Sequence, residues 1–123
     1  MGVKSYKIEE LFDVSNQVHN SLDDLIEKEN ALRELKFNYD LAVDTFKVSI
    51  SEELTEAGKK VFSNDILREA ELKNRLYQNG YNTLKKDIED KELEIKRVRR
   101  VIDRQKDFQL DLRVYFTILG KGV

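Results

Sequence analysis

The chain contains no cysteine, no proline and no tryptophan, and only five glycines among its 123 residues. Without cysteine it has no disulfide, no thiolate metal ligand and no thiol nucleophile. With no proline and few glycines, it lacks the turn residues that a multi-stranded sheet needs. No apolar run reaches the roughly 18 residues of a membrane-spanning helix, and the N-terminal residues lack the apolar core of a signal peptide. We therefore expect a helical protein with no membrane segment, and the lack of cysteine is compatible with the cytoplasm.

Charged residues make up 37% of the chain and apolar residues 40%, with a formal net charge of -2. This composition, combined with a heptad-like period, is typical of long helices. A net charge so close to zero indicates no particular partner. A narrow apolar stripe between charged faces builds a seam between helices, and such helices gain further burial by self-association.

The segment from Tyr81 to Leu112 carries the clearest periodicity. Its apolar residues recur every seven residues on two lines, which are the seam positions of a helix packed along its length against another helix. Lys91 and Gln105 interrupt the second line. The first line is Tyr81, Ile88, Ile95 and Ile102, and the second is Leu84, Val98 and Leu112.

The first half of the chain repeats this pattern on a stronger line and a patchier companion line. Residues 46–51 alternate apolar and polar side chains, as strands do, but they continue a helical run and have no second strand to pair with. We therefore expect helix there. The stronger line is Leu11, Val18, Leu25, Leu32, Tyr39 and Phe46, and the companion line is Ser15, Leu22, Glu29, Lys36, Val43 and Ile50.

Glycines and an asparagine mark the ends of the expected helices. Gly58 can end the first arm in the left-handed conformation, and Asn64 can cap the next helix. Gly80 either ends a short helix or lies inside a long one, and the shared register of the apolar lines on both sides favours a continuous or kinked helix.

Arms of nearly equal length with a short link must run antiparallel. Charge agrees with this pairing, because residues 1–57 carry 6 basic and 13 acidic side chains while residues 85–121 carry 11 basic and 8 acidic. We predict an all-α fold, a long antiparallel, coiled-coil-like helical hairpin that pairs into a bundle. Its single domain over residues 1–123 has arm one at 6–57, a link at 58–63, and arm two at 64–119 with a kink or short break near residue 80.

The link carries a short motif. It reads Lys60-Val61-Phe62-Ser63-Asn64, followed by Arg68, Leu76 and Tyr81. This pattern resembles small helical-hairpin proteins encoded by bacteriophages, prophages and other mobile elements. The resemblance covers residues 59–81 and implies a coiled hairpin in a bacterial cytoplasm, with no specific activity. Gly80 departs from the charged residue expected in that pattern.

No motif points to catalysis or to a cofactor. His19 with Asp23 is half of a helical metal pair, and no second strong ligand is in register. Without cysteine or a second histidine there is no pair of base and nucleophile for acyl transfer. The segment 120–122 is too short for a phosphate loop and follows a helix. We predict a non-enzymatic protein with no metal and no cofactor.

A basic run in the second arm consists of Lys96, Arg97, Arg99, Arg100, Arg104 and Lys106. Its candidate nucleic-acid-binding residues are Lys96, Arg97, Arg100 and Arg104. The three arginines are spaced three and four apart, so they share one helical stripe that can follow phosphates. Interleaved aspartates and the lack of aromatic residues for base stacking weaken this interpretation. The alternative is a solvated face paired with the carboxylates of the first arm.

The apolar residues exceed what one hairpin seam can bury. Phe12, Ile26, Leu35, Phe108 and Phe116 are the candidates for self-association, most simply as two hairpins in a four-helix bundle. The leading hypothesis is an interaction or scaffold protein of a phage or mobile element, working as a dimer or with another protein. The alternative is a nucleic-acid-binding accessory to phage replication or recombination.

Overall fold

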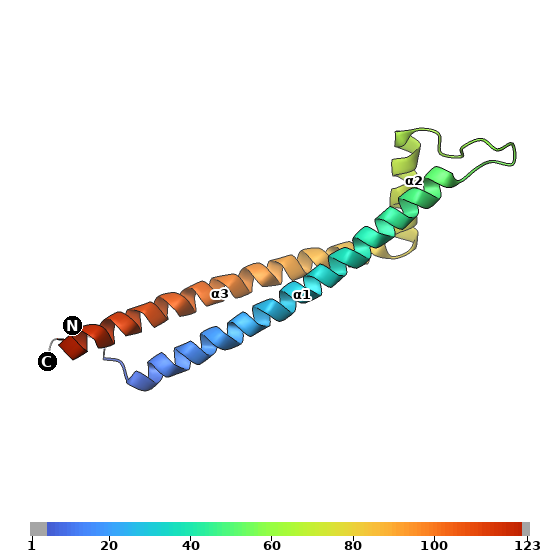
Figure 1. The fold of residues 1–123 in the computed structure, drawn as a ribbon. Coiled ribbons are helices and arrows are strands. Elements are labelled where there is room, and N and C mark those ends of the chain that lie inside the picture. The colour runs from blue at the N-terminus through green and yellow to red at the C-terminus, as the bar shows by residue number, and fades with distance from the viewer. Residues whose placement is uncertain (1–4, 122–123) are drawn as a thin grey trace. The chain divides into compact units, whose positions relative to one another are not determined.

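The computed structural model describes residues 5–121 and is all-α over that range, which confirms the predicted fold class (Figure 1). α1 spans Ile8–Glu52, α2 spans Asp65–Gln78 and α3 spans Tyr81–Lys121. Within residues 5–121 there is no β-strand. α1 passes without interruption through residues 46–51, so the expectation of helix instead of strand there is confirmed.

The helices are divided between two compact units. The described part of the terminal unit consists of residues 5–29 and 93–121, and the middle unit consists of residues 30–92. α1 and α3 each contribute a segment to both units, and α2 lies wholly in the middle unit. The single domain over residues 1–123 stays a prediction.

In the terminal unit, α1 and α3 run antiparallel. Gln109 Nε2 donates a hydrogen bond to Ser15 Oγ at 2.8 Å, and Arg99 Nη2 donates one to Glu29 Oε1 at 3.0 Å. Residue numbers therefore rise along one helix as they fall along the other. Edge-on ring contacts near the chain ends continue the same interface, and they join Tyr6 to Phe108 and Tyr115.

The core of the terminal unit is a narrow seam between these two segments. Most of its buried side chains come from the predicted seven-residue lines, and Leu112 is completely inaccessible to solvent. Val14 is the exception, because it belongs to neither predicted line of α1 but lies one turn before Val18 on the same face. The buried side chains are Val14, Val18, Ile95, Ile102 and Leu112.

In the middle unit, α2 packs with segments of α1 and α3. α1 and α3 are again antiparallel, with an ion pair of 3.2 Å between Lys36 Nζ and Glu92 Oε1. The rings of Phe46 and Tyr81 meet edge-on with centroids 5.8 Å apart. Lys36 thus lies at a predicted seam position but points to a partner at the edge. The buried apolar side chains of this unit are Ala42, Ile50 and Leu76.

α1 ends at Glu52, earlier than the predicted end of the first arm at residue 57. The following residues turn back in a hairpin-like loop, in which the Val61 N–H donates to the Glu53 carbonyl at 3.0 Å and Leu54 and Lys60 form an antiparallel β-bridge. Gly58 lies inside this loop with φ 76°, a left-handed conformation that favours glycine. The connection therefore starts earlier than the predicted link at 58–63, because Gly58 turns the chain after the helix has already stopped.

α2 begins at the predicted cap and ends at a break that the register did not reveal. The Asn64 side chain accepts a hydrogen bond from the Leu67 N–H at 2.9 Å, which confirms the N-cap. At the other end, the Asn79 N–H and side-chain Nδ2 both donate to the Arg75 carbonyl, and Gly80 has φ 79°. The favoured continuous helix is therefore wrong, and the alternative of a short break is correct.

Candidate functional site

The basic stripe of α3, defined as Lys96, Arg97, Arg100 and Arg104, is exposed to solvent. Within residues 5–121, none of these four side chains lies within 4.0 Å of a carboxylate oxygen. Their positive charges are therefore not neutralised by contacts inside the described chain. The spacing that predicted a shared face does place them along one side of the helix.

The carboxylates of α1 reach a different member of the same basic run. Arg99 Nη2 lies 3.0 Å from Glu29 Oε1 within the terminal unit. Of the described basic residues between positions 96 and 106, Arg99 alone makes an ion pair with α1. The alternative that paired the whole run with the first arm therefore holds for Arg99 and not for the basic stripe.

The five predicted self-association residues differ in exposure. Phe12 and Ile26 are 62% and 56% exposed and lie on one face of α1 in the terminal unit. Phe108 is 38% exposed, and its ring contacts the Tyr6 ring. Leu35 and Phe116 are half-buried. Phe12 and Ile26 are thus the members of this set with the most apolar surface left open.

A second open apolar surface lies in the last turns of α3, which the sequence marks as unusually apolar, although the predicted self-association residues there were Phe108 and Phe116. The apolar stripe, defined as Leu110, Val114 and Ile118, is 59%, 48% and 64% exposed. These three residues are each four positions apart, so they lie on one face of the helix, and this shared face could have been predicted from the sequence. The predicted seam line through Leu112 points to the opposite, buried side of the same helix.

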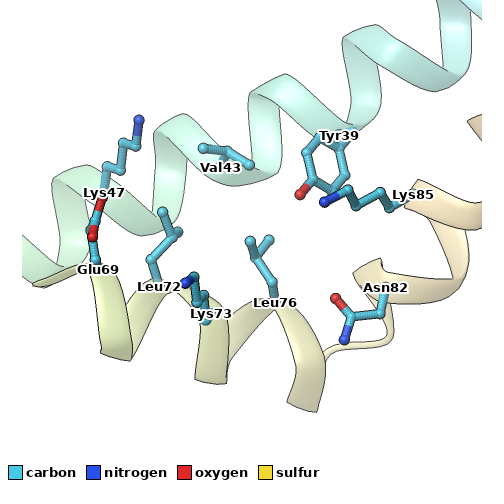
Figure 2. A pocket seen from close by; sticks show the side chains of 9 residues that line it. All are labelled: Tyr39, Val43, Lys47, Glu69, Leu72, Lys73, Leu76, Asn82 and Lys85. Atoms are coloured by element: carbon cyan, nitrogen blue, oxygen red, sulfur yellow. The ribbon is translucent and has the colours of Figure 1, made fainter.

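A cleft of about 520 Å³ in the middle unit is lined by all three helices (Figure 2). Its apolar side chains face one another across the cleft from α1 and α2, and Lys85 extends from α3 toward Tyr39. We call it the lysine cleft because three lysines line it. The lining residues are Tyr39, Val43, Lys47, Glu69, Leu72, Lys73, Leu76, Asn82 and Lys85.

Arg75 fixes α2 in place within the middle unit. Its guanidinium forms ion pairs with Glu71 and Glu53, donates to Ser49 Oγ at 3.3 Å, and lies 5.8 Å from the centre of the Phe62 ring. The hydrogen bonds to Glu71 and then Glu53 raise the pKa of Arg75 above its usual value. The pairing with Glu71, four residues earlier, was readable from helical spacing, whereas the contact with Glu53 required the turn of the chain.

No group of three potential metal ligands comes together among residues 5–121, and His19 is exposed there. The described helices include none with the length and apolar character needed to cross a membrane. Comparison with protein families, with curated proteins and with solved structures finds no match for this chain. The resemblance of the link to phage-encoded hairpin proteins therefore stays a prediction.

Proposed function

We propose that this chain is a non-enzymatic helical interaction protein that pairs with a second copy of itself. The observation that carries the proposal is the apolar stripe of α3, whose side chains are about half exposed or more on a single face. Phe12 and Ile26 add open apolar surface to the same unit. Contiguous apolar surface of this kind marks protein interfaces.

The charge distribution of the chain allows a second copy to cover the apolar stripe. The net charge of -2 gives little self-repulsion. Residues 1–57 are acidic on balance and residues 85–121 are basic, so the first segment of one copy can lie against the second segment of another with opposite charges opposed. The narrow seam also leaves each copy with little buried apolar area of its own.

Thermal unfolding at several protein concentrations tests the proposal. For a chain that folds with a partner copy, the Tm rises with protein concentration by mass action. The double variant Leu110→Gln/Ile118→Gln should stay helical and lose this dependence. The control Ile66→Gln/Tyr77→Gln replaces two exposed α2 side chains and should keep it. A Tm independent of concentration in the unmodified chain would refute self-association.

The proposed biological setting is a bacteriophage or other mobile element in a bacterial cytoplasm. Its support is the pattern from Lys60 to Asn64 with Arg68, Leu76 and Tyr81. Any protein partner in that setting would meet the same open apolar surfaces. Expression of a tagged chain in a lysogenic host, followed by fractionation, would place it in the cytoplasm if the setting is right.

Nucleic-acid binding is the second candidate function, and the unpaired basic stripe favours it. Guanidinium groups without a protein counterion can contact phosphates directly, because no ion pair inside the protein has to break first. Fluorescence anisotropy with short single- and double-stranded DNA, at low and physiological salt, tests it. Binding should weaken steeply with salt and disappear in Arg97→Glu/Arg100→Glu/Arg104→Glu. No binding at low salt would eliminate this candidate.

A further inference from the structure

The lysine cleft combines positive charge with an apolar floor. Leu76 is buried, and Val43, Leu72 and Tyr39 are half-buried. These side chains come from successive turns of α1 and α2, so the floor is a continuous apolar surface. At about 520 Å³ the cleft falls within the size range of small-molecule sites, about 300–1,000 Å³.

The charges around this floor are unbalanced. Lys47, Lys73 and Lys85 line the cleft, against the single carboxylate of Glu69. Within the described part of the chain, none of these lysines forms an ion pair. Figure 2 shows Lys85 reaching over the floor, whereas Lys47 extends away from it. A bound anion would supply the missing counter-charge.

The break between α2 and α3 adds to this preference for negative charge. Asn82 lines the cleft and belongs to the first turn of α3. Backbone N–H groups of a helix's first turn carry partial positive charge and lack partners inside the helix. The cleft therefore has Asn82 and Lys85 at its α3 end, Lys73 on α2, and apolar side chains along its floor.

We propose that the lysine cleft binds a small amphipathic anion, with its carboxylate, sulfonate or phosphate group near Lys73 and Lys85 and its apolar body on Val43, Leu72 and Leu76. The proposal is independent of self-association, because the apolar stripe belongs to the terminal unit and the cleft to the middle unit. The ligand is a free amphiphile, because a lipid whose chains stay in a bilayer would not lay its apolar body on this floor.

A two-dimensional amide NMR titration of the full chain with anilinonaphthalene sulfonate tests the proposal. Shift changes should concentrate at Val43, Leu72, Leu76 and Asn82. The variant Lys73→Glu/Lys85→Glu should weaken binding by about tenfold or more, because two favourable charge contacts become repulsive. The neutral variant Lys73→Gln/Lys85→Gln should give an intermediate loss, and circular dichroism of both should match the unmodified chain.

The matched control Lys59→Glu/Arg113→Glu makes the same change of charge at exposed positions outside the cleft and should leave the affinity within about twofold. Decanoate should displace the probe, and vesicles of phosphatidylglycerol should do so no better. Three results would each overturn the proposal. They are shift changes confined to the apolar stripe, an equal loss of affinity in Lys73→Glu/Lys85→Glu and in the control, and displacement of the probe by vesicles alone.

Discussion

Two glutamines on the inner face of α3 are in opposite situations. The Gln105 Oε1 is buried and has no hydrogen-bond partner among residues 5–121. Gln109, one turn later, donates to Ser15 Oγ at 2.8 Å. A buried polar atom without a partner costs about 1–3 kcal/mol, whereas a satisfied one is close to neutral. Gln105 is therefore a weak point in the seam, at a position where the sequence line is interrupted.

Replacing Gln105 with leucine should stabilise the chain. Gln105→Leu removes the unsatisfied oxygen and adds apolar surface to the seam, so the free energy of unfolding should rise by about 1 kcal/mol. The control Gln109→Leu loses the bond to Ser15 and should give no such gain. Urea unfolding followed by circular dichroism measures both. A Gln105→Leu variant less stable than the unmodified chain would contradict this reading of the seam.

Arg75 should matter more than any arginine of the basic stripe. Arg75→Ala removes contacts to α1, to α2 and to the connection between them, and should lower the free energy of unfolding by about 2 kcal/mol. Arg97→Ala, at an exposed site, should change it by less than about 0.5 kcal/mol. Equal effects of the two substitutions in urea titrations would show that the Arg75 contacts contribute no stability.

At the scale of the helices, the seven-residue periodicity predicted the buried side chains wherever a helix packs along one line. The lines through Val18, Ile95 and Ile102 are buried as predicted, because a seam requires apolar side chains at fixed intervals. Periodicity gave no warning of the break at Gly80, since the apolar register is the same on both sides. It also missed the early end of α1, which depends on hydrogen bonds across a turn.

How well each candidate site could be predicted depended on whether its residues are close together in the sequence. The basic stripe was identified because its members are near neighbours on one helix, and that relation is local. The lysine cleft was not, because Lys47, Lys73 and Lys85 come from three helices and line one cleft only after α2 folds back. Arg99 lies about 200° around the helix axis from Arg97 and directly follows the seam residue Val98, so the predicted seam register already favours Arg99 over Arg97 for a contact with α1.

Two glycines should respond to alanine in opposite directions. Gly80 has φ 79°, and a Cβ there would meet no atom within 4 Å, so Gly80→Ala should cost only conformational strain, about 1 kcal/mol. Gly120 lies in α3 with equally open surroundings, so Gly120→Ala should stabilise the helix by up to about 1 kcal/mol. Thermal unfolding compares them. A stabilising Gly80→Ala would favour a continuous α2–α3 helix in solution.

For the molecule as a whole, the described residues bury few side chains and leave both charge and apolar surface open. The basic stripe contributes no ion pair to the described fold, so Arg97→Glu/Arg100→Glu/Arg104→Glu should leave the Tm nearly unchanged. Differential scanning calorimetry at physiological salt measures this. A large drop in Tm would mean that these arginines pair with α1 carboxylates in solution, and nucleic-acid binding would lose its supporting observation.

Sedimentation equilibrium of the unmodified chain is the most direct test of the proposal that a second copy covers the apolar stripe. Over micromolar concentrations, the weight-average mass should rise toward twice that of the monomer, and Leu110→Gln/Ile118→Gln should remain at the monomer mass. A single species of monomer mass at every concentration, with the chain helical, would contradict self-association and leave the open apolar surface to a different protein.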